Sequence, residues 1–327
     1  MIGRRTFIAA IGIAAAWPVV ARAQQDRRVA RVGALMPFAE TDRGGTRAIQ
    51  SFREGLADLG WIEGRNLRID VGWTGPYAAA QRSHARGLVA LAPEVILASG
   101  TIATQALRDT TRAIPIIFVG LSDPVATGIV SNLARPEANV TGFMTYEHSI
   151  AGKWLSLLKD VAPTLTRVAI LFHPEATYAP FYVRTAQDAG ERLSLKVTAA
   201  VVPDVGAIES AIEAMSGDGG LAVFPDGFNI TNRGITIALA AKHRVPAIYA
   251  GRYNVVDGGL MSYGADILVA FRDGATYVDR ILRGAKPSEL PVQFATKFDL
   301  VINLKTAKAL GLTIPETLLA TADEVIQ

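Results

Sequence analysis

Two short segments of this chain recur farther along it at nearly the same offset. Residues 114–120, IPIIFVG, return as VPAIYAG at 245–251, and residues 31–37, RVGALMP, return as RVAILFHP at 167–174. The offsets are 131 and 136 residues, so two different strand-like runs repeat at almost one spacing. We therefore expect two similar α/β halves, each presenting its strand-end loops to a shared crevice, which is where open α/β sheets bind ligands.

Predicted strands and helices alternate along the chain between these repeats. Apolar residues at helical spacing in 45–59 stop at Gly60, a residue typical of helix C-termini, and residues 67–73 alternate as a strand. The predicted strands are 29–36, 67–73, 95–98, 116–119, 140–144, 168–172, 197–202, 221–224, 247–250, 260–263 and 299–302. The predicted helices are 45–59, 77–91, 102–109, 125–133, 151–161, 180–193, 205–215, 232–243 and 267–282. Such alternation is typical of parallel sheets covered on both faces and joined by right-handed crossovers.

The first 23 residues have the three regions of a secretory signal. Arg4 and Arg5 precede an apolar run of about fourteen residues, and an A-R-A cleavage sequence ends at Ala23. The run is short for a membrane span, which needs roughly 20 residues. The arginine pair resembles a twin-arginine export core, but Gly3 stands where Ser or Thr is usual, which favours the general secretory (Sec) route. We expect cleavage after Ala23 and a periplasmic protein.

Removal of this segment leaves a chain with no net charge. The whole chain has 33 Lys and Arg against 30 Asp and Glu, and the segment holds three arginines and no acid. A balanced mature chain gives no reason to expect nucleic acid as a partner.

The sequence also lacks the residues and motifs of several kinds of active site. With no cysteine, disulfides, thiolate catalysis and cysteine metal sites are excluded. The four histidines lack metal-ligand spacing, and no G-x-S-x-G, H-E-x-x-H or Walker motif occurs, so we expect neither an enzyme nor a metal or cofactor site.

Several motifs resemble one known family. They are RVGALMPF, SGTIATQAL, IPIIFVGLSDPVATGIV, RPEANVTGF, GGLMSYGAD and FDLVINLKTAKALGL. Together they resemble the ABC-transporter substrate-binding proteins of the uncharacterised type I family that includes tryptophan- and tyrosine-binding members. The most specific pieces are D-P-V from Asp123, N-V-T-G at 139–142 and S-Y-G at 262–264, and the departure is Glu137-Ala138, where many members have Gly-Gly.

This resemblance implies the type I periplasmic-binding-protein fold, with two Rossmann-like lobes and a hinge of three chain crossings. We expect a first lobe from 28–143 and 265–296 and a second lobe from 144–264 and 297–327. The resemblance also implies a monomeric receptor that closes on a small ligand and delivers it to an ABC permease. A ligand-sensing subunit of a membrane signalling protein is the alternative, and a periplasmic α/β enzyme is a more distant one.

Polar candidates for ligand contact lie where predicted strands end. Ser99 and Thr101 flank the turn into the helix at 102–109, where hydroxyls and helix amides can hold a carboxylate, although Thr101 can also be a simple N-cap. Ser122 is a second hydroxyl donor. Asp123 before Pro124 has the pattern of an N-cap, and Asp226 lies in a Pro-Asp-Gly turn. If either aspartate points inward, an amino acid is favoured, and if both are caps, a plain acid fits better.

Aromatic residues gather in the same predicted loops. Flat rings there can enclose a planar ligand, so an aromatic amino acid or aromatic carboxylate is the expected ligand. The candidate rings are Phe38, Tyr178, Phe228 and Tyr253, and Tyr146 is expected as hinge or crevice wall. Trp73 and Trp154 are better explained as core residues.

Overall fold

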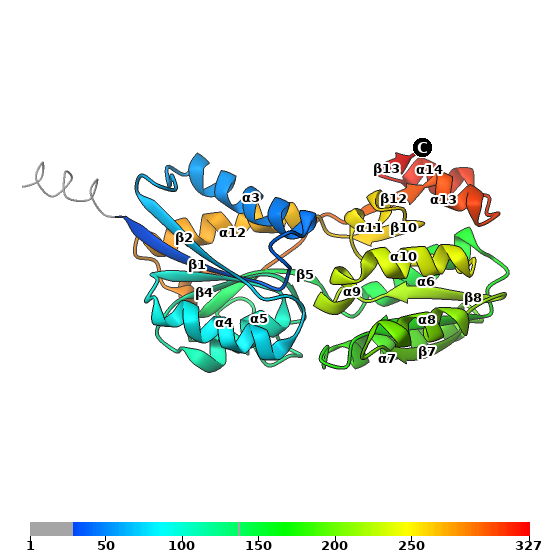
Figure 1. The fold of residues 1–327 in the computed structure, drawn as a ribbon, viewed down its shortest axis with the longest axis horizontal. Helices are drawn as coiled ribbons and strands as arrows, with labels where there is room; N and C mark the ends of the chain where they lie inside the picture. Colours follow the sequence, from blue (N-terminus) through cyan, green and yellow to red (C-terminus); the bar gives the residue numbers. More distant parts are fainter. Residues whose placement is uncertain (1–28, 137) are drawn as a thin grey trace, which may run out of the picture.

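The computed structural model describes residues 29–136 and 138–327, so the expected signal segment and Glu137 of the family motif lie outside the described residues. Two separate sheets, each with helices on both faces, form two units that we call the first and second lobes (Figure 1). The α/β prediction is confirmed. Within the described ranges, no helix combines the length and apolar character that crossing a membrane requires.

The first lobe is built on a six-stranded sheet in the order β11-β5-β4-β3-β1-β2, with every pairing parallel. Its strands are β1 (Ala30–Met36), β2 (Leu67–Trp73), β3 (Val95–Ser99), β4 (Ile116–Ser122), β5 (Val140–Tyr146) and β11 (Gln293–Phe294). Helices α3 (Arg43–Asp58) and α12 (Ile267–Leu282) cover one face, and α4 (Ala78–Ala90) and α5 (Thr101–Thr110) cover the other. Each covered face has its own apolar core. Side chains of β1 point alternately into these two cores, as a strand buried on both faces requires.

The second lobe is built on a seven-stranded sheet in the order β13-β12-β10-β9-β8-β6-β7. Its strands are β6 (Arg167–Phe172), β7 (Lys196–Val201), β8 (Gly219–Val223), β9 (Ala247–Tyr249), β10 (Met261–Gly264), β12 (Asp299–Asn303) and β13 (Glu324–Ile326). Its helices are α6 (Ile150–Val161), α7 (Ala179–Arg192), α8 (Val205–Glu213), α9 (Gly227–Thr231), α10 (Arg233–Lys242), α11 (Arg252–Val256), α13 (Leu304–Ala309) and α14 (Glu316–Thr321). A fully parallel sheet was the wrong expectation here, because β12 pairs antiparallel with β10. The chain re-enters this lobe at the end where β10 leaves it, so β12 must run back along β10.

The repeated segments occupy equivalent strands of the two sheets. The order β2-β1-β3-β4-β5 in the first lobe matches β7-β6-β8-β9-β10 in the second. RVGALMP supplies β1 and RVAILFHP supplies β6, while IPIIFVG supplies β4 and VPAIYAG supplies β9. The repeats are therefore the central strands of two lobes with one topology.

The chain passes between the two sheets three times, after β5, after β10 and after β11. The lobe boundary that we expected at residue 143 falls inside β5, which continues to Tyr146. Two motif glycines lie beside these crossings. A Cβ on Gly264 would lie 1.9 Å from the Ala250 carbonyl oxygen, and one on Gly142, whose φ is +153°, would lie 2.0 Å from the Phe118 carbonyl oxygen. Close backbone approach therefore explains the glycines of N-V-T-G and S-Y-G.

The helix predicted at 125–133 does not form. Residues 124–128 make a turn instead, and the Asp123 side chain accepts a hydrogen bond from the Ala126 amide at 3.1 Å. Gly128 has a φ of +68°, which ends the helical path after a single turn.

Candidate ligand-binding site between the lobes

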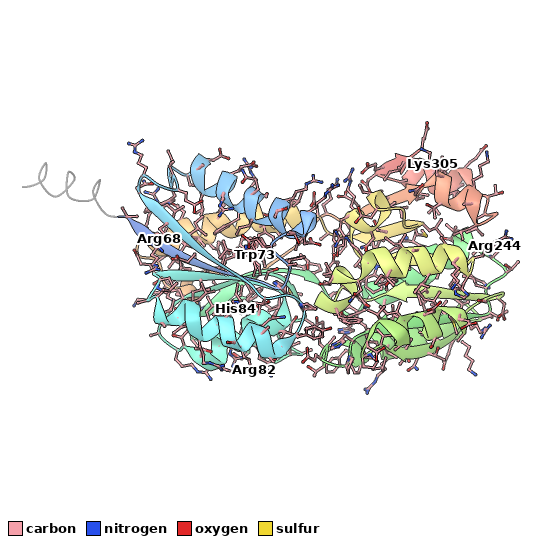
Figure 2. All side chains as sticks on the ribbon, viewed as in Figure 1. Arg68, Trp73, Arg82, His84, Arg244 and Lys305 are labelled. Atoms are coloured by element: carbon pink, nitrogen blue, oxygen red, sulfur yellow. The ribbon has the colours of Figure 1, made fainter. Side chains whose placement is uncertain are left out.

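Residues that follow the parallel strands of one lobe contact the other lobe, and side chains from both lobes lie in the space between them (Figure 2). Tyr178 of the second lobe brings its hydroxyl beside the hydroxyl of Thr101 in the first. Tyr182, on α7, has its buried hydroxyl near Ser122 at the end of β4, where it makes no hydrogen bond within the described residues. Burial raises the pKa of both phenols far above the ordinary value, and the neighbouring hydroxyls of Thr101 and Ser122 oppose that rise. The phenols therefore stay neutral at physiological pH and can donate hydrogen bonds.

The first turn of α5 is the polar wall contributed by the first lobe. Gly100 is its N-cap residue, with φ of +80°, and no side chain caps the helix there. Thr101 is the first helical residue rather than the N-cap, so the simple-cap interpretation of Thr101 is wrong. Its Oγ1 accepts a hydrogen bond from the Ser122 amide at 3.4 Å, and it is 5% exposed. Uncapped amides at the start of a ten-residue helix, next to the hydroxyls of Ser99 and Thr101, form an arrangement that suits an anionic group.

Asp123 and Asp226 are both engaged by the protein. Besides its bond to the Ala126 amide, Asp123 lies with Oδ2 3.0 Å from Nδ1 of His148. Its backbone has a φ of +41°, a strained conformation of the kind that clusters at ligand sites. Asp226 is 2% exposed, caps α9 through the Asn229 amide at 2.8 Å and accepts the His173 amide at 2.9 Å. Asp226 therefore caps a helix, whereas Asp123 closes the turn at 124–128 and pairs with His148.

Burial raises the pKa of Asp226 to about 6, although the backbone amides of Asn229, His173 and Phe228 favour the ionised form. In the unfolded chain the same carboxyl has its ordinary pKa, so between about pH 4 and 6 only the folded protein holds the proton. The contribution of Asp226 to the free energy of unfolding is therefore greatest below that range and is lost as the pH rises through it.

We expect the free energy of unfolding to fall by about 3 kcal/mol between pH 4 and 6 on account of Asp226. Asp226→Asn keeps an N-cap oxygen and cannot ionise, so its unfolding free energy lacks this fall. Urea denaturation of both proteins at several pH values measures the difference. A constant difference between wild type and variant across the range would contradict the assignment.

The aromatic candidates lie in different parts of the site. Phe228 is buried, and its ring centroid is 4.7 Å from that of His173 in a stacked arrangement. Tyr253 has the Arg233 guanidinium 5.7 Å from its ring centroid, and burial raises its pKa to about 12. Tyr146 donates from its hydroxyl to the Ala250 carbonyl at 3.1 Å, so it ties the end of β5 to the second lobe. Phe38 packs over Gly45 in the first turn of α3, on the first-lobe side.

Sequence reasoning missed a second group of residues on the rim of this site. His173, which the sequence shows only as one of four scattered histidines, is buried between Phe228 and Tyr77 of the first lobe, whose ring centroid is 6.1 Å away. Glu175 accepts a hydrogen bond from the Ala78 amide at 3.0 Å, which caps α4 from the other lobe. The signal was present in the sequence, since His173 and Glu175 directly follow the repeated strand β6.

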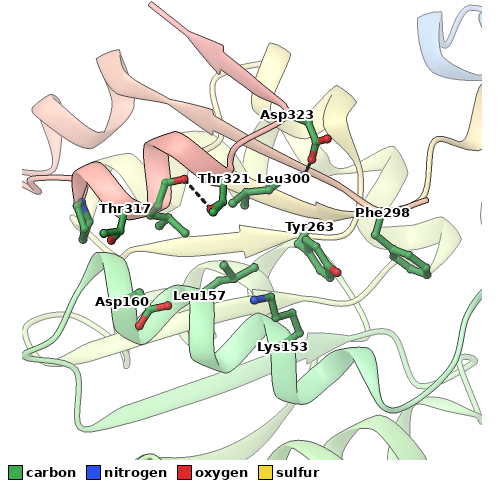
Figure 3. A pocket seen from close by; sticks show the side chains of 11 residues that line it. Lys153, Leu157, Asp160, Tyr263, Phe298, Leu300, Thr317, Thr321 and Asp323 are labelled. Carbon is green, nitrogen blue, oxygen red and sulfur yellow. Dashed lines mark hydrogen bonds between the residues drawn. The ribbon is translucent and has the colours of Figure 1, made fainter. Parts of the chain in front are cut away.

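Two cavities lie away from the strand ends that form this site. One, of about 500 Å³, is in the second lobe between α6, β10 and α14, with Lys153 and Tyr263 on its wall (Figure 3). The other, of about 450 Å³, lies between β2 and α4 of the first lobe. Within residues 29–136 and 138–327, no three His, Cys, Asp or Glu side chains are grouped so as to hold a metal ion.

Two lobes of one topology, joined by three chain crossings, define the two-lobed fold of the type I periplasmic-binding class. A family model described as ABC transporter substrate binding protein matches residues 39–326. The chain belongs to this family, and the resemblance found in its motifs is confirmed.

Three relatives show how close the similarity is. The tyrosine-binding protein of Clostridioides difficile (strain R20291) is 25% identical over 268 residues, which are 81% of this chain and 77% of the relative. The crystal structure of a conserved domain protein from Vibrio cholerae has a TM-score of 0.85 at 28% identity, over 91% of this chain and 100% of that one. An ABC domain in complex with L-Trp from Streptococcus pneumonia has a TM-score of 0.84 at 25% identity, with the same coverage.

Proposed function

We propose that this protein is the exported receptor of an ABC importer and that its lobes close on a small aromatic carboxylate or aromatic amino acid. The observation that carries the proposal is the uncapped first turn of α5, with Ser99 and Thr101 beside it, directly opposite the buried phenol of Tyr178. A carboxylate on the α5 amides gains charge-assisted hydrogen bonds from the first lobe. A ring on the same ligand meets Tyr178, Phe228 and Tyr253 of the second lobe.

Contacts to both lobes exist only when they are closed, so the ligand shifts the equilibrium toward the closed form. The receptor then presents a closed surface to a membrane permease. Its expected signal segment places it in the periplasm, and we propose that it acts there as a monomer. The proposed ligand contacts are Phe38, Ser99, Thr101, Ser122, Tyr146, Tyr178, Phe228 and Tyr253, and we propose that Asp123 and Asp226 line the site with carboxylates already bonded to the protein.

Two observations favour different members of the ligand class. The relatives include a tyrosine-binding protein and an L-Trp complex, which favours an aromatic amino acid. The bonds that Asp123 and Asp226 already make to protein groups leave neither carboxylate free for an ammonium group, which favours a plain aromatic acid. The carboxylate is common to both, so it is the group that the test must address.

A thermal-shift screen separates these ligands. It compares L-tyrosine, L-tryptophan and aromatic acids that lack the amino group with sugars and polyamines. We expect stabilisation by aromatic carboxylates. Stabilisation by sugars or polyamines alone, with no response to any carboxylate, would overturn the proposed function.

Thr101→Ala is expected to weaken binding of the responding carboxylate about tenfold, because it removes one hydroxyl contact at the α5 terminus. Thr110→Ala is the matched control, since Thr110 ends the same helix and its hydroxyl bonds only the Ala106 carbonyl. Isothermal titration calorimetry measures both affinities. Equal affinities for the two variants would remove Thr101 from the site.

A further inference from the structure

One ion pair joins the two lobes directly at the rim of the site. Nη1 of Arg233, the first residue of α10 in the second lobe, is 2.7 Å from Oδ2 of Asp42 in the first lobe. Both side chains are 15% exposed, so water screens this pair less than a surface pair. The pair needs no ligand atom to form.

The surroundings of Arg233 hold its guanidinium in place. Nε bonds Oδ2 of Asp257 in its own lobe at 2.8 Å, Nη1 also donates to the Ile230 carbonyl at 2.9 Å, and the group lies 5.7 Å from the centroid of the Tyr253 ring. The same guanidinium thus contacts a proposed ligand residue and the opposite lobe. A preordered side chain loses little freedom when Asp42 approaches it.

Asp42 is equally fixed on its side. Its Oδ1 caps α3 through the Gly45 amide at 2.8 Å, which leaves Oδ2 directed to Arg233. On the opposite face of the first-lobe sheet, the contact between Glu175 and the Ala78 amide also joins the lobes. The rim is therefore held on the α3 side by an ion pair and on the α4 side by a helix cap.

We propose that Arg233 and Asp42 are positioning residues that hold the lobes closed, so that a closed form is populated without ligand and the release of bound ligand is slowed. Closure then depends on charges of the protein itself, and the ligand binds to a closed form that is already populated and stabilises it further.

Asp42→Asn isolates this contact. Asparagine is as good an N-cap as aspartate, so α3 keeps its cap, and Arg233 keeps its pair with Asp257. Asp257→Asn is the matched control, because it removes an ion pair from the same guanidinium within one lobe.

Small-angle scattering of the ligand-free proteins is the first test and does not rest on the proposed ligand. We expect a larger radius of gyration for Asp42→Asn than for wild type and Asp257→Asn, with thermal unfolding temperatures unchanged. Arg233→Gln should open the lobes similarly, and Asp42→Asn should add nothing in that background. Equal radii for wild type and Asp42→Asn, or equal opening by Asp257→Asn, would overturn the proposal.

Binding kinetics are the second test and rest on the proposed function. With L-tyrosine or L-tryptophan as the probe, we expect Asp42→Asn to raise the dissociation rate about five- to tenfold and to change the association rate less than about twofold. An unchanged dissociation rate would overturn the retention role. If neither amino acid binds, the amino-acid member of the proposed ligand class fails, whereas the scattering result still decides whether the ion pair holds the lobes.

Discussion

Replacing Trp154 with alanine is expected to lower the free energy of unfolding by about 3 to 5 kcal/mol. The indole is 1% exposed in the core of the second lobe, and its ring is stacked on Tyr182 at a centroid distance of 6.3 Å. Its Nε1 donates to the Tyr263 carbonyl in β10 at 2.8 Å. The substitution therefore leaves a large cavity and an unpaired, partly buried acceptor at once.

Trp154→Phe is the control that separates these two causes. Phenylalanine keeps most of the ring volume but cannot donate, so a loss of about 1 to 3 kcal/mol is expected from the unsatisfied carbonyl and the smaller ring. Urea denaturation followed by circular dichroism measures both variants. A loss below about 1 kcal/mol for the alanine variant would show that this packing does not hold α6 against β10.

The second large effect is expected at Gly264, where alanine should cost at least about 3 kcal/mol of unfolding free energy. The added Cβ would lie 1.9 Å from the Ala250 carbonyl oxygen and 3.1 Å from Cε1 of Tyr146. That oxygen accepts the Tyr146 hydroxyl bond across the hinge, so relief of the overlap displaces the acceptor as well. The same change should therefore also weaken closure.

Gly87→Ala provides the matched control for a new methyl group. Gly87 lies in α4, and a Cβ added there would have no atom within 4 Å, so alanine should stabilise by about 0.5 to 1 kcal/mol through helix propensity. Thermal and urea unfolding of the two variants should move in opposite directions. A Gly264→Ala protein as stable as wild type would contradict the close approach of β10 to Ala250.

Long elements were predictable because each carries several turns or alternations of its own pattern. The structure gives α12 as Ile267–Leu282 and β2 as Leu67–Trp73, the ranges that periodicity predicted. Helices α9, α11, α13 and α14 were missed because five or six residues span less than two turns, too few for a periodic signal. The helix at 125–133, in contrast, was predicted but does not form. Its Asp-Pro start is equally typical of the turn that the structure shows there.

The candidate site was predictable only as far as local sequence reaches. Their positions at strand ends made Thr101 and Tyr178 candidates. That the two lie beside each other could not be predicted, because they belong to different lobes and no local pattern links them. Tyr182 lies on the buried face of α7, where an aromatic residue is indistinguishable in sequence from a core residue. Arg233 begins an ordinary helix, and its partner Asp42 is 191 residues away. Contacts of that kind depend on how the lobes close.

The three crossings also determine when each lobe can be completed as the chain is made. The sheet of the first lobe needs α12 over the face where Phe52 is buried, and it needs β11 beside β5. The sheet of the second lobe needs β12 and β13, which end at Ile326. Neither core can therefore close until almost the whole chain has been synthesised, and this late completion suits the export as an unfolded chain that we propose for this protein.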